Sequence, residues 1–325
     1  MKGRTLLWPL SALSLGVPLA GLLYQQLASF VDTRHYPPPG QLIDVGGVRL
    51  HLYCLGQSVG RPSVVLEGGI PSTCLDWWKV QPAVAQWTQV CSYDRAGFGW
   101  SDSGRGASTS QGLVEQLHVL LTRVGLPAPY ILVGHSFGGL LVRLYASRYP
   151  QEVAGLVLVD STPEDLYLLQ PDLAHATQHE SRQLHRLSWL APFGVIRVAL
   201  AVGSHPAAHL NYPPEIRPVL QALFSQTRFL RETARAQAAL AEGMSQVRAS
   251  RSALPPLPLV VLSQRSETDF DDPEAAAIWH RLQRDLLTLS PESQQIMAEE
   301  SGHYIQLDQP ELVIEAIKSL VLQSE

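Results

Sequence analysis

One serine lies between two glycines in a pattern that can make it a nucleophile. Residues Gly134-His135-Ser136-Phe137-Gly138 fit the spacing G-x-S-x-G, after the apolar stretch Tyr130–Val133 and before the helix-like stretch Leu140–Tyr149. At such a strand-to-helix turn the serine is strained, the glycines leave room for strand and helix, and the helix points its positive end at the reacting centre. We therefore predict that Ser136 is a nucleophile. The alternative is a glycine-rich turn without chemistry.

A serine hydroxyl needs a base before it can attack a carbonyl carbon. The chain has 11 histidines, so chain order has to choose among them. In folds with a serine at this kind of turn, the histidine comes last, after the final strand. His303 lies just past the strand-like Gln294–Ala298 and is predicted to be the base. His135 neighbours the serine in a tight turn, where its side chain points elsewhere, and we interpret it as a packing or pocket residue.

The acid that orients this histidine has more than one candidate. Asp160 ends the apolar stretch Val153–Val159, whereas Glu267 and Asp269 follow the next strand-like stretch. A carboxylate at either place can hold the imidazole tautomer and stabilise the imidazolium. Asp160 is favoured because it directly ends a strand, although it can also be read as a capping residue. Glu267 and Asp269 remain the alternatives, and a solvated acidic loop is their plainer interpretation.

Negative charge on a reacting carbonyl needs two backbone N–H donors. Phe137, the residue after the nucleophile, is one predicted donor. The second is expected from the loop after Ser63–Glu67, at Ile70 within Gly68-Gly69-Ile70-Pro71. An ordinary glycine turn is the alternative for that loop.

Strand-like and helix-like stretches alternate along most of the chain, which predicts a mostly parallel sheet with helices on both faces. Gly46-Gly47 indicates a hairpin ahead of this alternation. The expected strands are Gln41–Val45, Val48–Cys54, Ser63–Glu67, Thr88–Asp94, Tyr130–Val133, Val153–Val159, Leu257–Ser263 and Gln294–Ala298. The expected helices are Leu75–Trp87, Ser110–Val124, Leu140–Tyr149, Pro273–Leu289 and Pro310–Leu322. Residues 161–252 lack clear strands and are interpreted as a helical cap inserted over the carboxyl edge of the sheet.

Composition excludes some classes of function. The 325 residues carry a net charge of −5 with no Lys/Arg-rich run, so nucleic-acid binding is not expected. Cys54, Cys74 and Cys91 lack metal-binding spacing and are interpreted as small apolar core residues, with one disulfide as the alternative for an exported domain. His175 and His179 share a helix face, but no HExxH arrangement accompanies them, so no metal is expected.

The N-terminal residues 1–34 are predicted to be a membrane anchor, followed by a single catalytic domain over residues 35–325. Lys2 and Arg4 precede the uncharged run Thr5–Val31, in which Leu6–Tyr24 is mostly apolar and about long enough to cross a bilayer. Basic residues ahead of the run place the following domain outside the cytoplasm. A cleaved signal and a secreted domain, or binding to a lipid surface, are the alternatives. Nothing in the sequence indicates an oligomeric state.

Taken together, these motifs resemble the α/β-hydrolase superfamily over roughly residues 41–321. The resemblance rests on the serine turn, the Gly-Gly-Ile-Pro loop, the run from Tyr93 to Asp102 and Ser301-Gly302-His303. Relatives of this subgroup end the strand after the serine helix with an aspartate, which matches Asp160. The chain departs from the pattern at Glu67, where many relatives have histidine, and at Glu267, where the later acid is usually aspartate.

The resemblance implies an α/β-hydrolase fold and a serine hydrolase that works through an acyl-enzyme without a cofactor. A serine at the turn argues against haloalkane dehalogenase and epoxide hydrolase chemistry, which related enzymes perform with aspartate. The expected partner is a small-molecule acyl substrate, with a carboxylic ester as the first choice. Amide, peptide, thioester and C–C cleavage are alternatives on the same triad. A non-catalytic protein that binds a small apolar ligand is the alternative from another class.

Overall fold

The fold is organised around one eight-stranded sheet. A computed structural model describes residues 7–58, 60–104, 109–203, 210–266, 270 and 272–323. The strand order is β1-β2-β4-β3-β5-β6-β7-β8. β2 pairs antiparallel with both of its neighbours, β1 and β4. All other neighbouring strands pair parallel. The strands are β1 (Gln41–Asp44), β2 (Arg49–Leu55), β3 (Ser63–Glu67), β4 (Val90–Tyr93), β5 (Tyr130–His135), β6 (Val153–Val159), β7 (Leu259–Gln264) and β8 (Ser293–Ala298).

Helices cover both faces of this sheet, which confirms the predicted architecture. Alternate residues of β5 belong to different cores: Leu132 packs on one side, whereas Ile131 and Val133 pack on the other. Burial on both faces explains why inner parallel strands such as β5 and β6 are mostly apolar, whereas the edge strand β8 is half polar. The first core is completed by α3 (Ser110–Arg123), α4 (Phe137–Arg148) and α10 (Pro273–Asp285), and the second by α2 (Val80–Val84) and α12 (Pro310–Gln323).

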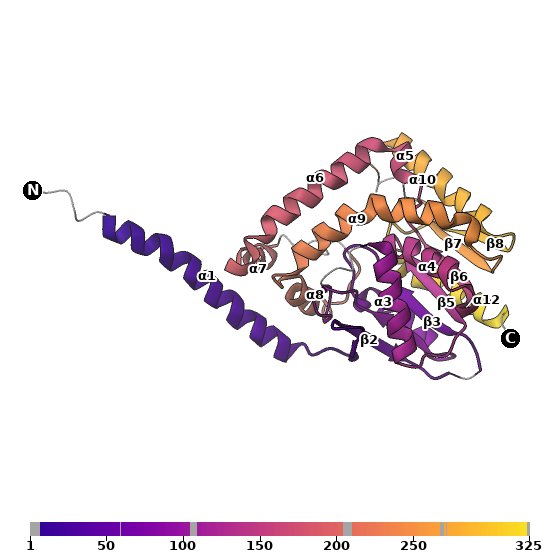
Figure 1. Ribbon diagram of the computed structural model, residues 1–325, viewed down its shortest axis with the longest axis horizontal. Coiled ribbons are helices and arrows are strands. Elements are labelled where there is room, and N and C mark those ends of the chain that lie inside the picture. The colour runs from indigo at the N-terminus through magenta and orange to yellow at the C-terminus, as the bar shows by residue number, and fades with distance from the viewer. Residues whose placement is uncertain are drawn as a thin grey trace, which may run out of the picture.

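A helical cap is inserted between β6 and β7, as predicted. Its two longest helices, α6 and α9, pack side by side (Figure 1). Its helices are α5 (Leu166–Leu169), α6 (Pro171–Ser188), α7 (Val195–Ala201), α8 (Arg217–Phe224) and α9 (Phe229–Ser250), with the short turn η3 (Ala191–Phe193).

The N-terminal stretch folds as α1 (Leu7–His35), which extends away from the sheet in Figure 1. Among the residues that the structure describes, no helix is both long enough and apolar enough to cross a bilayer. The predicted membrane anchor is therefore not supported. Polar residues within α1 serve protein contacts instead: Gln25 donates to Ser225 O at 2.9 Å, and Asp32 pairs with Arg197 of the cap at 2.6 Å.

The expected helix over Leu75–Trp87 is shorter in the structure. A turn of 3-10 helix, η1 (Cys74–Trp77), precedes α2, which contains Pro82. Proline lacks the N–H that a longer helix would need at that position, so α2 begins only two residues before it.

The interpretation of three unpaired cysteines is wrong. Cys54 and Cys91 form a disulfide, and within the described chain only Cys74 is free, in a buried position. The two bonded residues lie directly opposite each other on antiparallel strands β2 and β4. This register brings their Cα atoms to 4.1 Å. Cysteine spacing alone does not reveal that pairing, because it depends on the register of two strands 37 residues apart.

Candidate active site

Ser136 occupies a strained turn between β5 and α4. Its φ of 52° and ψ of −121° lie in a region that few residues other than glycine adopt. Three backbone hydrogen bonds hold the turn: Ser136 N–H donates to Val159 O at 3.1 Å, and Ser136 O accepts from Gly139 and Thr162 at 3.0 Å each. The side chain makes no capping hydrogen bond to α4. The turn therefore leaves the hydroxyl available for chemistry.

The glycines of the motif allow three segments to meet at this turn. A Cβ atom on Gly134 would lie 2.6 Å from Gly138 O, and one on Gly138 would lie 2.5 Å from Glu67 O. Side chains at these positions would push the strand, the helix and the loop after β3 apart. Glycine at both positions is thus a packing requirement for this close approach.

Asp160 and His303 meet across 143 residues of chain. Asp160 is fully buried, and its Oδ2 lies 2.6 Å from Nδ1 of His303. Its other oxygen, Oδ1, accepts from Gln264 N–H at 3.2 Å and from Trp279 Nε1–H at 3.1 Å. A carboxylate that accepts all three donors keeps the histidine proton on Nδ1, which leaves Nε2 to act as a base.

Of the predicted acids, Asp160 is the one that the structure describes. Glu267 and Asp269 lie outside the described residues. Asp160 has a φ of 39°, a second strained position in the site. Sequence reasoning missed Gln264 and Trp279 as partners of this carboxylate. No local signal identifies them, because Trp279 belongs to a helix that begins 113 residues after Asp160 in the printed sequence.

Ser136 and His303 line the same cavity, which has a volume of about 900 Å³. Apolar side chains from the cap and from α10 form much of its wall. They are Leu166, Tyr167, Leu173, Leu210, Leu240 and Trp279. Polar groups near His303, including Glu299, Glu300 and Asp308, line another part. The cap thus supplies most of the apolar surface that a bound molecule would contact.

His135 contacts the loop that carries His303. Its Nε2 lies 2.9 Å from the backbone oxygen of His303, and its ring packs on Tyr304. Burial, followed by the nearby His303, holds the pKa of His135 well below the usual value for histidine. A neutral ring donates from Nε2 to the carbonyl, so its placement matches the predicted packing role.

The two predicted oxyanion donors belong to segments that lie next to Ser136. Phe137 is the first residue of α4, so its N–H has no acceptor within the helix. The loop before Ile70 comes close to the nucleophile: a Cβ atom on Gly69 would lie 3.1 Å from Cβ of Ser136. Both segments thus lie next to Ser136, and their role as oxyanion donors stays a prediction.

A buried carboxylate links this loop to the cap. Asp76 accepts from Ser72 Oγ and from Tyr212 Oη, both at 2.7 Å. Burial raises the pKa of Asp76 to about 6. Because the folded protein holds this proton more tightly than the unfolded chain, the stability contributed by protonated Asp76 is complete at low pH and is lost as pH rises towards 6.

We expect an Asp76→Asn variant to lack this pH dependence, because an amide stays neutral. Between pH values of about 4 and 7, the unfolding free energy of the variant minus that of the wild type should rise by roughly 3 kcal/mol. Urea unfolding at several pH values measures this difference. A difference that stays constant with pH would contradict the raised pKa.

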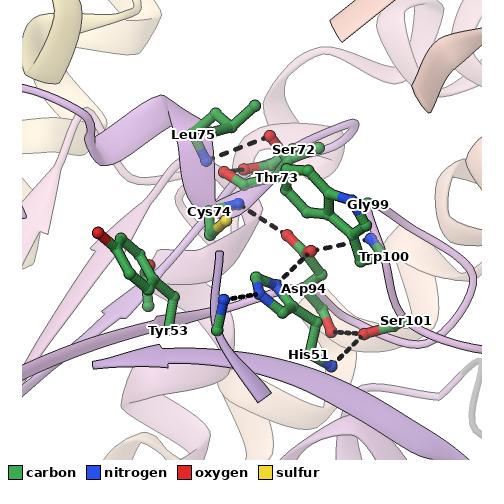
Figure 2. A network of polar contacts seen from close by, with 12 residues as sticks. His51, Tyr53, Ser72, Thr73, Cys74, Leu75, Asp94, Gly99, Trp100 and Ser101 are labelled. Atoms are coloured by element: carbon green, nitrogen blue, oxygen red, sulfur yellow. Dashed lines mark hydrogen bonds and ion pairs between the residues drawn. The ribbon is translucent and has the colours of Figure 1, made fainter. Parts of the chain in front are cut away.

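His51, Cys74 and Asp94 are the described residues grouped closely enough to hold a metal ion. Figure 2 shows that hydrogen bonds already satisfy this group. His51 Nε2 accepts from Gly40 N–H, so its Nδ1–H donates to Asp94 at 2.8 Å. Asp94 also accepts N–H groups from Cys74 and Trp100. Burial raises the pKa of the Cys74 thiol well above its usual value, which disfavours a metal-binding thiolate. This network supports the turn after β4.

The chain is similar to known hydrolases over most of its length. The family model of the alpha/beta hydrolase fold matches residues 62–310. A protein from Gibberella zeae, named as an AB hydrolase superfamily protein, is 25% identical over 292 residues, which cover 80% of this chain and 86% of that protein. The uncharacterized protein C23C11.06c of Schizosaccharomyces pombe is 32% identical over 190 residues, 49% of this chain, and the match spans only 34% of that protein. A solved thermophilic esterase from Thermogutta terrifontis shares the fold with a TM-score of 0.63 and 21% identity, over 87% of this chain and 97% of that one.

Proposed function

The chain belongs to the alpha/beta hydrolase fold family, and on that premise we propose that it is a serine hydrolase that cleaves carboxylic esters through an acyl-enzyme on Ser136. The observation that carries the proposal is the 2.6 Å hydrogen bond between Asp160 and His303. That histidine lines the same cavity as a serine whose strained turn leaves its hydroxyl uncapped. A nucleophile, a base and an orienting acid are the three groups that acyl transfer requires.

In the proposed first half-reaction, Ser136 Oγ bonds to the acyl carbon and its proton passes to Nε2 of His303. The N–H groups of Phe137 and Ile70 stabilise the resulting oxyanion. The bond between the acyl carbon and the alcohol oxygen then breaks, and the alcohol leaves with the proton from His303. Asp160 stabilises the imidazolium during both proton transfers.

Water completes the reaction in the second half. It gives one proton to His303 while its oxygen bonds to the acyl carbon, and the same backbone donors stabilise the second oxyanion. The bond from the acyl carbon to Ser136 Oγ then breaks. The carboxylic acid leaves, and His303 returns its proton to the serine. No cofactor enters either step.

The cavity favours a substrate with an apolar acyl group. Its volume of about 900 Å³ and the leucine and aromatic side chains of its wall suit a medium-length or bulky chain. Amides, thioesters and C–C bonds next to a carbonyl are the alternative substrates on the same triad. The volume alone does not separate these bond types, so the assay must do so.

The test compares p-nitrophenyl esters of increasing acyl length with the thioester and the anilide of the same acyl groups. We expect turnover of the esters, with a burst of p-nitrophenol equal to the enzyme concentration where deacylation is slow. Faster turnover of the thioester or anilide would change the substrate class but keep the mechanism. Binding of the acyl compounds without any turnover would contradict the proposal and favour a ligand-binding protein.

We also propose that the catalytic domain works outside the cytoplasm. The disulfide between Cys54 and Cys91 supports this placement, because such bonds persist in oxidising compartments and are rare in the cytosol. Fractionation of the expressing cells and alkylation of the denatured protein test it. We expect the domain outside the cytoplasmic fraction, with Cys74 as the one alkylated cysteine. A domain in the cytoplasmic fraction with three free thiols would contradict the proposal.

Loss of this disulfide should lower stability more than loss of the free thiol. The two cysteines are 37 residues apart in the sequence. For a loop of this size, chain entropy predicts that the disulfide stabilises the fold by about 4 kcal/mol. We expect the double variant Cys54→Ser, Cys91→Ser to lose a large part of that amount in urea unfolding. Cys74→Ser is the matched control. Equal losses in the two variants would contradict a stabilising disulfide.

A further inference from the structure

Arg95 contacts the loop that carries the proposed second oxyanion donor. It follows β4, and only 5% of its side chain is exposed. Its Nη1 donates to Glu67 Oε1 at 2.5 Å and to Gly68 O at 2.6 Å. Its Nη2 donates to Gly69 O. One guanidinium thus holds two successive backbone carbonyls of the loop after β3.

These hydrogen bonds fix the directions of the neighbouring N–H groups. In a trans peptide the C=O and the following N–H point in opposite directions. The carbonyls of Gly68 and Gly69 point at Arg95, so the N–H groups of Gly69 and Ile70 point away from it. The loop also passes close to the nucleophile, because a Cβ atom on Gly69 would lie 3.1 Å from Cβ of Ser136.

The guanidinium is itself fixed in place by buried groups. Glu67 pairs with it, and the second carboxylate oxygen of Glu67 accepts from Tyr93 Oη. The guanidinium carbon also lies 5.4 Å from the ring centre of Phe137, whose N–H is the first proposed oxyanion donor. Arg95 therefore contacts both segments that supply the proposed donors. These contacts also give a role to Glu67, which stands where many relatives have histidine.

We propose that Arg95 is a positioning residue that forms the oxyanion hole by holding the carbonyls of Gly68 and Gly69. The proposal rests on the proposed function at Ser136. Without the guanidinium, the peptides of this glycine-rich loop are free to rotate, and the Ile70 N–H leaves the position where charge develops. Stabilisation of the transition state is then lost, although the substrate still binds in the cap cavity.

The test uses Arg95→Met, which keeps the apolar stem and removes the donors. With p-nitrophenyl octanoate we expect kcat to fall by about 100- to 1000-fold, the loss for one oxyanion donor, with KM little changed. The trifluoromethyl ketone with the same heptyl chain bonds to Ser136 and forms an oxyanion, so its affinity should fall by a similar factor. The matching methyl ketone measures binding of the chain and should be unaffected.

Arg143→Met is the matched control for the loss of a buried ion pair. Arg143 is 3% exposed and forms two hydrogen bonds to Glu164, at 2.7 and 2.8 Å. We expect this variant to unfold at lower temperature but to keep its kcat and its ratio of ketone affinities. If Arg95→Met loses no more kcat and no more trifluoromethyl ketone affinity than Arg143→Met, the proposal is overturned.

A second variant covers the case in which Arg95→Met does not fold. Tyr93→Phe removes only the hydroxyl that holds Glu67. We expect kcat and trifluoromethyl ketone affinity to fall together by about tenfold, the equivalent of one hydrogen bond to a charged group. Unchanged values in a folded Tyr93→Phe protein would overturn the proposal.

A crystal structure of a folded variant separates failure of this proposal from failure of the proposed function. In Arg95→Met we expect the Gly69–Ile70 peptide to turn from its wild-type orientation. In Tyr93→Phe we expect a smaller displacement of the Arg95 guanidinium from that peptide. An unmoved loop in the folded variant would overturn the clamp whether or not the protein hydrolyses esters. If the wild-type protein hydrolysed no ester, or if its turnover did not depend on Ser136, the proposed function alone would be contradicted.

Discussion

Replacing Ser136 by alanine is expected to reduce ester turnover on the order of a millionfold, the effect of removing the nucleophile from a serine triad. The hydroxyl makes no capping hydrogen bond to α4, and the turn is held by backbone hydrogen bonds that alanine retains. The variant should therefore fold like the wild type and still bind substrate in its cavity. Turnover of p-nitrophenyl esters at high enzyme concentration measures the loss.

Ser110→Ala is the control for this substitution. Ser110 is buried at the start of α3, and its Oγ has no hydrogen-bond partner among the described residues. This variant should keep wild-type turnover. If Ser136→Ala also kept it while remaining folded, hydrolysis would not depend on Ser136 and the mechanism would be wrong.

Asp160→Asn is expected to cost on the order of ten-thousandfold in kcat/KM, the loss seen when a triad histidine adopts the wrong tautomer. The reason lies in the other contacts of this carboxylate. Its Oδ1 accepts from Gln264 N–H and Trp279 Nε1–H, so an asparagine oxygen is needed there. The amide NH₂ then faces His303 Nδ1, which must accept. The remaining proton moves to Nε2, where a general base requires a lone pair.

The alternative acids provide the comparison for this variant. Glu267→Gln and Asp269→Asn should change kcat/KM little if Asp160 orients His303. A large loss in either one, together with an active and folded Asp160→Asn protein, would assign the acid to the later loop. Trp279→Phe should lower kcat/KM by an intermediate amount, because it removes one donor to Asp160 but keeps the aromatic packing.

The fold was predictable because its signals are local. The inner parallel strands are short, mostly apolar runs, and the serine turn carries its own glycines between a strand and a helix. The mostly parallel sheet was predicted from this alternation, and the helical insertion from the lack of clear strands over residues 161–252. The shortened α2 was missed because Pro82 makes the helix begin later than the apolar spacing indicates.

The site was predictable only where one residue carries its own signal. Ser136 and His303 were predicted from motif and chain order, whereas Asp160 was favoured over the later acids by its position at the end of a strand, with support from the resemblance. The donors that fix Asp160 come from β7 and α10, and Arg95 reaches carbonyls of the loop after β3. Such contacts depend on strand register and rotamers, which no local pattern encodes.

The predicted N-terminal anchor is not supported by the described residues. An apolar run of the right length is typical of a membrane anchor, but length and composition do not show which polar residues of the helix contact the rest of the protein. In the structure Gln25 bonds to the cap across 200 residues, and Asp32 pairs with Arg197. The disulfide between Cys54 and Cys91 was left open because cysteine spacing does not show which strands are neighbours.

The most direct test of the account is covalent labelling with a fluorophosphonate, followed by peptide mapping by mass spectrometry. Ser136 Oγ should displace fluoride and bond to phosphorus, with one adduct per chain on the peptide that contains Ser136. The Ser136→Ala protein should remain unlabelled, and Asp160→Asn should label much more slowly. A folded wild-type protein that stays unlabelled, or that carries its adduct on another residue, would contradict Ser136 as the nucleophile.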